Sequence, residues 1–317
     1  MKILFAAALA LLNCAACAQN WPAKPVRLLV PFPAGTGPDV VARLLGARLV
    51  SVWGQQVVVE NRPGAGGVAG ANALVHSAPD GYILALVPAT VVTLTPVLLK
   101  DPPFDAGRDV VPVAMVATSP FMIAVNPGAG VATLAELVRL AREQPGKINV
   151  AVVALFSATH LTTELLNAAA GIRLFAVPYN GSPNAVVAAV TGQSQAIVDS
   201  VGVVAPQWKG GKLRLLAVTS PQRLPNYPDI PAAAETLPGF QVIGWVAVFA
   251  PKGTPAAIVE KVNRDVSSVI QVPDFAAKLV EIGFYPSPES AAGFTQFLKS
   301  ERERWGKIAR DAGVQPQ

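Results

Sequence analysis

Short β-rich runs alternate with helix-length segments through the first part of this 317-residue chain. The alternation begins with a strand-like run at 26–30 and an amphipathic segment at 40–53, and continues with strand-like 57–60, a small-residue helix at 70–76 and strand-like 82–87. Strand, helix and strand at this spacing predict a parallel sheet with helices on its faces. The chain is therefore expected to have an α/β fold.

The same pattern returns after a helical segment at 134–144. A strand at 149–153 precedes a helix at 158–169, and a strand at 174–177 precedes a helix at 185–192. A second open, mostly parallel sheet flanked by helices is implied.

Two long β segments, 114–126 and 240–250, are expected to carry the chain from one lobe to the other and back. We expect lobe 1 to comprise residues 19–121 plus 246–317, and lobe 2 to comprise residues 122–245, with a ligand cleft between the lobes. Helices at 255–270 and 288–312 are expected to cover the first lobe.

The first 18 residues have the features of a secretory signal peptide. Lys2 precedes an apolar run at 3–12, and Ala16-Cys17-Ala18 provides the small residues of a cleavage site. The run is too short to span a membrane, which needs about 20 residues. We expect export to the periplasm and cleavage after Ala18, with lipid attachment at Cys17 as the alternative.

The only two cysteines, Cys14 and Cys17, lie in this leader. The mature protein is then expected to have no disulfide, no thiolate metal site and no cysteine nucleophile, so that its core must supply the stability.

Composition excludes disorder, because 52% of the residues are hydrophobic and only 14% are charged. The formal charge of +5 comes from Lys and Arg residues spread along the chain, without the basic run or interleaved aromatics of a nucleic-acid-binding protein. We expect no nucleic-acid partner, whereas a mildly cationic surface suits an anionic ligand.

The turn at 31–39 leaves a strand and enters a helix, and ligands bind at the carboxyl ends of strands in open parallel sheets. Thr36 or Gly37 can cap the helix, Pro38 suits its first turn, and Asp39 complements its positive end. Its glycines let backbone N–H groups approach a ligand, although a well-capped turn without a ligand is the alternative.

Two further predicted helix starts, 156–160 and 179–183, also follow strands. Several helix ends can together bind an anion, and none of the three loops contains Lys or Arg. Backbone amides, hydroxyls and water are therefore expected to recognise a carboxylate.

Enzymatic alternatives are poorly supported. The run at 64–69 fits a relaxed dinucleotide fingerprint, but residues 60–63 separate it from the strand. The run at 192–196 lacks the final glycine of a nucleophile elbow. His76 and His160, the only histidines, have no metal-ligand spacing. We expect no catalytic residue, no metal and no cofactor.

An ordered set of motifs across nearly the whole mature chain resembles the tripartite tricarboxylate transporter receptor family, also called Bug receptors. The set comprises Trp21-Pro22-Ala23-Lys24-Pro25-Val26-Arg27, Val30-Pro31-Phe32-Pro33-Ala34-Gly35, Val58-Val59-Glu60-Asn61-Arg62-Pro63-Gly64-Ala65-Gly66-Gly67, Pro79-Asp80-Gly81-Tyr82, Val177-Pro178-Tyr179 and Leu216-Ala217-Val218-Thr219-Ser220.

The resemblance implies a monomeric, two-lobed periplasmic-binding-protein fold of type II-like architecture. It also implies a receptor for a small carboxylate that serves membrane permease subunits of a tripartite transporter. The alternative partner is a sensor protein that reads the ligand-bound state. The implied ligand-binding residues are Phe32, Ala34, Gly35, Thr36, Asp39, Gly66, Ala89, Thr90, Ser157, His160, Tyr179 and Asp199.

One stretch departs from the family pattern. Where the family has a Ser- and Gly-rich turn, this chain reads Ala151-Val152-Val153-Ala154-Leu155-Phe156. If Val152, Ala154 and Phe156 form a wall of the site, the preferred ligand is a monocarboxylate with an apolar tail or ring, because unpaired polar groups are costly to bury there. The alternative is that these side chains pack into the core of the second lobe.

Overall fold

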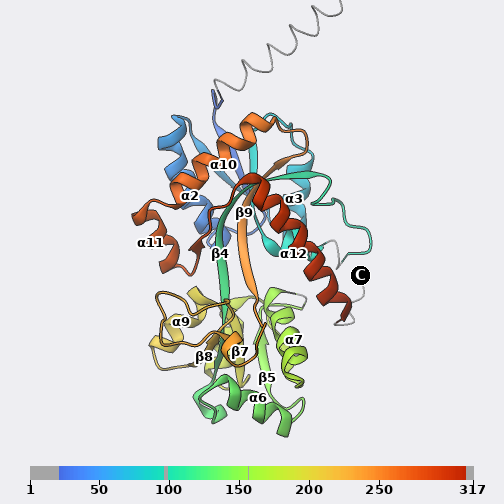
Figure 1. The fold of residues 1–317 in the computed structure, drawn as a ribbon, viewed down its shortest axis with the longest axis vertical. Coiled ribbons are helices and arrows are strands. Elements are labelled where there is room, and N and C mark those ends of the chain that lie inside the picture. Colours follow the sequence, from blue (N-terminus) through green and yellow to red (C-terminus); the bar gives the residue numbers. More distant parts are fainter. Residues whose placement is uncertain (1–20, 96–98, 156, 312–317) are drawn as a thin grey trace, which may run out of the picture. The chain divides into compact units, whose positions relative to one another are not determined.

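The computed structural model describes residues 21–95, 99–155 and 157–311, and its residues group into two compact units. Of these described residues, unit 1 contains those from 21 to 116 together with 246–276 and 287–303, and unit 2 contains those from 117 to 245 together with 277–286 and 304–311. The predicted leader at 1–18 and Phe156 lie outside the described residues. Figure 1 shows the elements of both units.

Unit 1 is built on three parallel strands, in the order β2, β1, β3. Because β2 and β3 lie on opposite sides of β1, right-handed crossovers place the connecting helices α2 and α3 on opposite faces of the sheet. The antiparallel strand β9 pairs with β3. The elements are β1 Val26–Val30, α2 Gly37–Trp53, β2 Val57–Asn61, α3 Val68–Val75, β3 Ile83–Pro88, α4 Ala89–Thr93, β9 Ile243–Pro251 and α10 Ala256–Ile270.

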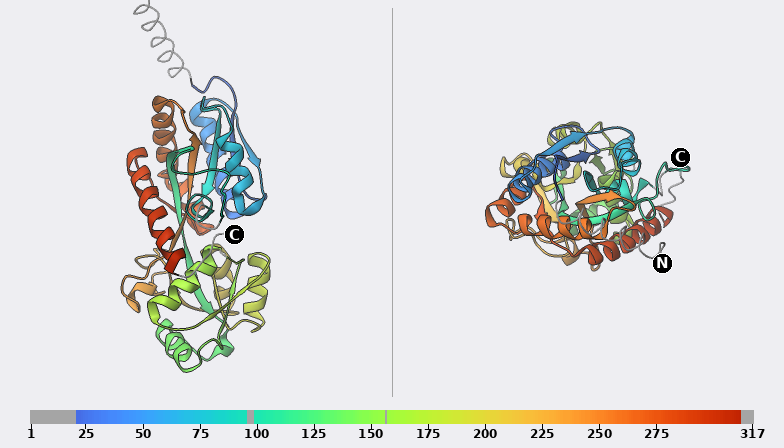
Figure 2. Two further views of the ribbon diagram at one scale, coloured as in Figure 1. Left: turned by 90° about the vertical axis from the view of Figure 1, so that its right-hand side faces the viewer. Right: turned by 90° about the horizontal axis from the view of Figure 1, so that it is seen from above.

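Helix α10 packs on α2, and both cover the same face of the unit 1 sheet. The apolar spacing of α10 places Ile258, Val262 and Val266 on its buried side. Figure 2 shows the orange helix α10 beside the strands from two further directions. The early part of helix α12 (Ala291–Asp311) adds Phe294, whose ring meets Phe249 of β9 edge-on with centroids 5.4 Å apart.

Unit 2 repeats this plan with three parallel strands in the order β7, β5, β6. The long strand β4 pairs antiparallel with β7 and with β8, and the short strand β10 pairs with β4. The elements are β4 Val110–Val125, α6 Leu134–Glu143, β5 Asn149–Val152, α7 Ala158–Ala170, β6 Phe175–Pro178, α8 Ser182–Val190, β7 Ala196–Ser200, α9 Val201–Lys209, β8 Arg214–Val218 and β10 Tyr285–Pro286. Helices α11 (Pro273–Glu281) and α12 contain residues of both units.

The core of unit 2 forms where α8 and α9 meet the inner face of its strands. Met122, Ala151 and Ile197 are fully buried there, and Val204 joins them from α9. Many of the buried residues are Ala or Val, so the helices lie close to the sheet.

The expected α/β fold is confirmed, and both units have helix-flanked sheets in which parallel strands carry an antiparallel neighbour. Strands β4 and β9 each contain residues of both units. Among the described residues, no helix is both long enough and apolar enough to cross a membrane.

Candidate functional site

Three loops meet at the carboxyl edge of the unit 1 sheet, because β1, β2 and β3 run parallel and end at the same edge. A side chain at Gly67 would lie 2.6 Å from Val91 of α4 and 3.2 Å from Phe32 of the first loop. A side chain at Gly70 would lie 2.7 Å from the backbone of Pro31. These glycines therefore allow the three loops to pack closely.

Asp39 organises the first of these loops. Its carboxylate is 1% exposed and accepts hydrogen bonds from the backbone N–H of Gly35 at 2.8 Å, Nδ2 of Asn61 at 2.8 Å and Nε of Arg43 at 3.0 Å. Asn61 Nδ2 also donates to the carbonyl of Phe32 at 3.0 Å. One buried carboxylate thus ties together the first loop, helix α2 and the end of β2.

Burial by itself raises the pKa of Asp39, but the hydrogen bonds from Arg43, Gly35 and Asn61 outweigh burial, and the pKa is lowered. Asp39 therefore remains ionised at neutral pH. Its carboxylate oxygens accept hydrogen bonds from Gly35, Arg43 and Asn61, so Asp39 stabilises the conformation of the first loop.

The helices that begin at this edge lack side-chain caps, although in α3 the N–H of Ala69 donates to the carbonyl of Gly64 at 3.4 Å. Thr36, Gly67 and Pro88 are the N-cap residues of α2, α3 and α4, and no side chain caps any of the three. The hydroxyl of Thr36 instead donates to the carbonyl of Pro33 at 2.7 Å. Helix α6, elsewhere in the chain, is capped by Thr133, whose Oγ1 accepts from the N–H of Glu136 at 3.1 Å. Uncapped first turns leave N–H groups directed at an anion.

The other predicted residues of unit 1 lie on the same three loops. Ala34 and Gly35 are exposed, and Gly35 has a φ of 82° with open space around it. Gly66 is exposed with a φ of 65°. Ala89 is buried and Thr90 is partly buried at the start of α4. Sequence reasoning therefore selected residues that the fold brings to one edge.

Unit 2 has a matching edge, at the carboxyl ends of β5, β6 and β7. Here Ser157 caps α7: its Oγ accepts from the N–H of His160 at 3.3 Å and donates to the carbonyl of Ala154 at 2.7 Å. Oγ1 of Thr159 lies 2.9 Å from the same hydroxyl and accepts from the N–H of Val153 at 3.0 Å. The Ser157 hydroxyl thus holds the loop that precedes α7.

His160 lies in the first turn of α7, with a side chain that is 14% exposed. Its Nε2 is 3.8 Å from Oε1 of Glu164. Burial lowers the pKa of His160 and the charge of Glu164 opposes that shift only in part, so the ring is neutral at neutral pH.

Tyr179 points into its own unit. Its hydroxyl lies 3.1 Å from Oγ of the fully buried Ser194, and its ring packs against the unit 2 core. Its backbone N–H donates to the carbonyl of Val152 at 2.9 Å. Tyr179 fixes the β6–α8 loop from inside.

Asp199, at the end of β7, is 3% exposed. Its Oδ1 accepts from the N–H of Ser200 at 2.7 Å. Burial raises the pKa of Asp199, and the N–H of Ser200 with the nearby hydroxyls of Ser182 and Ser200 offset only part of that rise.

The predicted apolar wall is only partly present at this edge. Val152 is wrong as a wall residue, because it is 0% exposed in the core of unit 2, as the structural alternative expects. Ala154 is exposed, and Leu155 is 56% exposed, whereas Phe156 lies outside the described residues. Leu155 is therefore the large apolar side chain that the described part of this loop presents.

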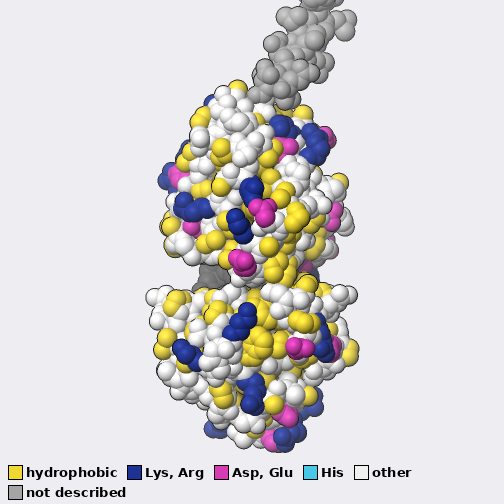
Figure 3. Space-filling model, turned by 90° about the vertical axis from the view of Figure 1, so that its left-hand side faces the viewer, with side chains coloured by type: hydrophobic (Ala, Val, Ile, Leu, Met, Phe, Trp, Pro, Cys, Tyr) yellow, Lys and Arg dark blue, Asp and Glu magenta, His cyan; other side chains and the backbone are white. Residues whose placement is uncertain are grey.

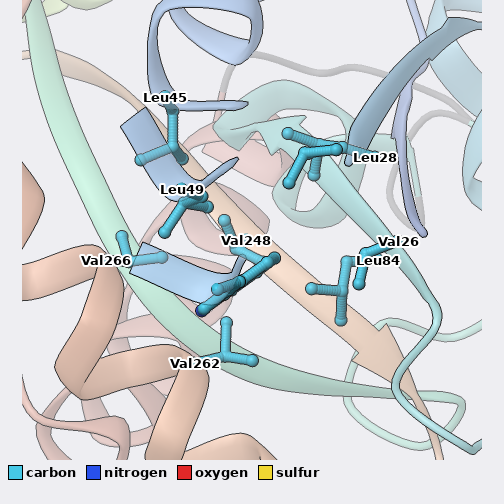
Figure 4. A pocket seen from close by; sticks show the side chains of 10 residues that line it. Val26, Leu28, Leu45, Leu49, Leu84, Val248, Val262 and Val266 are labelled. Atoms are coloured by element: carbon cyan, nitrogen blue, oxygen red, sulfur yellow. The ribbon is translucent and has the colours of Figure 1, made fainter. Parts of the chain in front are cut away.

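A small apolar gap lies inside unit 1, between the sheet and helices α2 and α10. Leu28, Leu45, Leu84 and Val262 are among its lining residues (Figure 4). Its volume of about 10 Å³ corresponds to roughly one water molecule. Because binding sites for small molecules are far larger, at about 300 to 1,000 Å³, this gap is a packing feature of the core.

Charged side chains are interspersed on the face drawn in Figure 3, where Lys and Arg stand next to Asp, Glu and hydrophobic groups. Within the part of the chain that the structure describes, no group of three His, Cys, Asp or Glu side chains is placed to hold a metal ion.

Comparison with known proteins gives a consistent result. Residues 41–314 match the model of the "Tripartite tricarboxylate transporter family receptor". The chain is 35% identical over 302 residues to Protein BugT of Bordetella pertussis, covering 94% of this chain and 92% of that one. It is also 35% identical over 312 residues to a protein in the tcbD-tcbE intergenic region of Pseudomonas sp. (strain P51), covering 97% and 93% of the two chains.

Two similar solved structures contain ligands. R. palustris Rpa4515 with adipate has a TM-score of 0.84 and 33% identity, and the match covers 94% of this chain and 100% of that chain. MatC from Rhodopseudomonas palustris with bound malate has a TM-score of 0.78 and 30% identity, with coverages of 91% and 99%.

Proposed function

Because the chain belongs to the tripartite tricarboxylate transporter receptor family, we propose that it is an extracytoplasmic receptor that captures a small carboxylate for the membrane subunits of such a transporter. The family consists of solute-binding receptors, and two of the similar structures hold adipate and malate. The proposal is supported most directly by the three uncapped helix starts gathered at the carboxyl edge of unit 1.

The physical basis for carboxylate binding is a set of free backbone amides. Each helix N-terminus favours an anion by about 0.3 to 1 kcal/mol, and each charge-assisted hydrogen bond contributes about 1.5 to 3 kcal/mol. A few such contacts reach the roughly 8 kcal/mol that corresponds to micromolar affinity. The network of Asp39 holds the first loop in place before the ligand arrives, which reduces the entropy that binding costs.

Residues in both units are proposed to contribute to capture. In unit 1 these are Phe32, Ala34, Gly35, Thr36, Gly66, Ala89 and Thr90, with Asp39 and Asn61 as positioning residues. In unit 2, Ser157 and Tyr179 position loops from inside, whereas His160, Asp199 and Leu155 are the proposed contact residues. Leu155 favours ligands with a hydrocarbon portion.

A thermal-shift panel tests this function. Mature protein, freed of any co-purified ligand by unfolding and refolding, is mixed with adipate, malate, succinate, citrate, benzoate or isovalerate. We expect at least one acid to raise the melting temperature in a concentration-dependent manner, because a ligand that binds only the folded state stabilises it. The neutral amides of the same acids serve as matched controls and are expected to have no effect. Equal shifts with acid and amide would contradict carboxylate recognition.

Export is proposed from the leader at 1–18, and an intact-mass measurement on periplasmic protein tests it. A mass that corresponds to a chain beginning at Gln19, with no reactive thiol, is expected. A mass that retains Cys17 and includes an added acyl group would establish a lipoprotein instead.

A further inference from the structure

One carboxyl oxygen of Asp199 is buried without a hydrogen-bond partner among the described residues. Oδ1 accepts from the N–H of Ser200 at 2.7 Å, but Oδ2 has no hydrogen-bond partner among the described residues although the side chain is only 3% exposed. Buried polar atoms are almost always hydrogen-bonded, and an exception therefore requires an explanation.

The position of this oxygen points to a ligand. Asp199 lies near the end of β7, at the edge where parallel strands end and open α/β sheets bind their ligands. The adjacent Ser200 is the N-cap residue of α9, and Ser182, which opens α8, is close enough to influence its carboxyl group. Helices α8 and α9 are each nine residues long, and no side chain caps the N-terminus of either. The unpartnered oxygen and two free helix starts thus lie together at one edge of unit 2.

The surroundings of β7 provide little positive charge that would stabilise an ionised carboxylate. Strands β4 and β5 and helix α8 pack against β7 and contain no titratable side chain, and α9 has only Lys209, at its last residue. Helix α7 contributes His160 and Glu164, and Tyr179 precedes α8. Burial is the main cause that raises the pKa of Asp199. Asp199 is therefore protonated more readily than an exposed aspartate, and a proton on the unpartnered Oδ2 needs an acceptor.

We infer that Asp199 holds a proton and donates it through Oδ2 to an oxygen of the bound carboxylate. This inference rests on the proposed function and adds a coupled proton to it. An ionised Asp199 would repel the ligand, so any molecule in which Asp199 is ionised must take one proton from solvent as the anion binds. The only covalent change is the O–H bond that forms on an ionised Asp199, with solvent as the proton source, and an Asp199 protonated in this way returns that proton to solvent when the ligand leaves.

Isothermal titration calorimetry in buffers of different ionisation enthalpy tests this inference. The titrant is succinate or benzoate, whichever gives the larger thermal shift. As the pH rises through the pKa of Asp199, the wild type should take up an increasing fraction of a proton, up to about one per ligand, and its affinity should fall up to about tenfold per pH unit.

Two variants at this position provide the contrast. Asp199→Asn presents an N–H donor at every pH, so it should bind within about threefold of the best wild-type affinity, without proton uptake. Asp199→Ala lacks the donor and should bind at least about tenfold more weakly. Circular dichroism and a melting curve for each variant establish that it is folded, and Asp199→Asn keeps the test valid if Asp199→Ala does not fold.

Proton uptake by the neighbouring histidine would have a different signature. Whatever binding His160→Gln retains should still be accompanied by proton uptake. Binding without uptake in His160→Gln, or uptake that survives in Asp199→Asn, would assign the proton to another group and overturn the inference. Binding by the wild type without any uptake, or unchanged binding by Asp199→Ala, would overturn it while leaving the proposed function intact. If the wild type bound neither acid nor any other member of the panel, both proposals would be wrong.

Discussion

Two buried aspartates lie near helix starts, Asp39 in the first turn of α2 in unit 1 and Asp199 on strand β7, which leads into α9 in unit 2. Asp39 is 1% exposed and Asp199 is 3% exposed, yet the pKa of the first is lowered and that of the second is raised. Asp39 has a backbone N–H, an amide and a guanidinium as donors, whereas one oxygen of Asp199 has none among the described residues. Burial alone therefore does not decide the direction of the pKa shift: the hydrogen bonds that the carboxylate accepts decide it as well.

The comparison predicts the largest effect at Asp39. Asp39→Ala removes the acceptor for Gly35, Arg43 and Asn61 and should lower the free energy of unfolding by about 2 to 4 kcal/mol. Urea titration followed by circular dichroism measures it. Asp274→Ala is the matched control, because Asp274 is also in the first turn of a helix and pairs with Arg48, but is exposed. The control should lower the free energy of unfolding by at most about 1 kcal/mol. An equal decrease in both variants would show that the hydrogen bonds of Asp39 stabilise the fold no more than an exposed ion pair does.

The two acids should also affect stability in opposite directions as the pH changes. The pKa of Asp39 is depressed, so its contribution is present above the unfolded pKa of about 3.9 and disappears as the pH falls through the folded pKa. The pKa of Asp199 is raised, so its stabilising form is the protonated one, and stability declines as the pH rises from about 3.9 to the folded pKa.

The difference in unfolding free energy between wild type and Asp199→Asn isolates the second effect. That difference should fall with rising pH by up to about 1.4 kcal/mol per unit, and become constant above the folded pKa of Asp199. Urea titrations at several pH values provide the measurement. A difference that rises with pH would mean that Asp199 is stabilised as the anion.

A smaller effect separates loop shape from fold stability in unit 1. Gly35 and Gly54 lie at opposite ends of α2, with φ values of 82° and 63° and open space around both. Gly35→Ala and Gly54→Ala should each reduce stability by about 1 to 2 kcal/mol, because alanine is strained in this conformation. Only Gly35→Ala should weaken carboxylate binding, by about fivefold, or roughly 1 kcal/mol. If calorimetry found equal affinities for the two variants, the first loop would not be part of the ligand-binding site.

The smallest expected effect concerns Leu155. Leu155→Ser should weaken binding of benzoate or isovalerate by about two- to fourfold, with little effect on malate. The effect is small because Leu155 is exposed, so only part of its side chain would be covered by the ligand. Val187→Ser on α8 is a matched control, because Val187 is 60% exposed. A uniform loss for all acids would indicate a change in the loop instead of a lost apolar contact.

Strongly periodic elements could be predicted from the sequence with good accuracy. Strand β1 was predicted at 26–30, where it is found, and α2 differs from its prediction by three residues at its start. Gly37, Pro38 and Asp39 form that first turn, and their low helix propensity hides it from a periodicity argument. The capping chemistry of the same residues identifies the turn correctly.

Several short elements were not predicted, and one of them contains Asp199, a proposed site residue. Strand β7 was not predicted, because Ala196-Ile197-Val198 is too short a run to distinguish a strand from a turn. Helices α9 and α11 were not predicted either. Asp199 was therefore selected through the family resemblance, and the sequence gives no sign that one of its oxygens is unpartnered. Val152 was misassigned for a related reason: near the end of a strand, alternation of side chains between the faces decides burial, and a register change of one residue reverses it.

Strand β4 is one continuous run, Val110–Val125, yet its residues are divided between the units, and the same is true of β9. The sheet of unit 1 gains its antiparallel neighbour for β3 only when residues 246–249 become available. Unit 2, by contrast, has β4, β5, β6 and β7 in one uninterrupted stretch. Because a chain is synthesised from its N-terminus, the later unit therefore has all the strands of its main sheet before strand β9 of the earlier unit has been made.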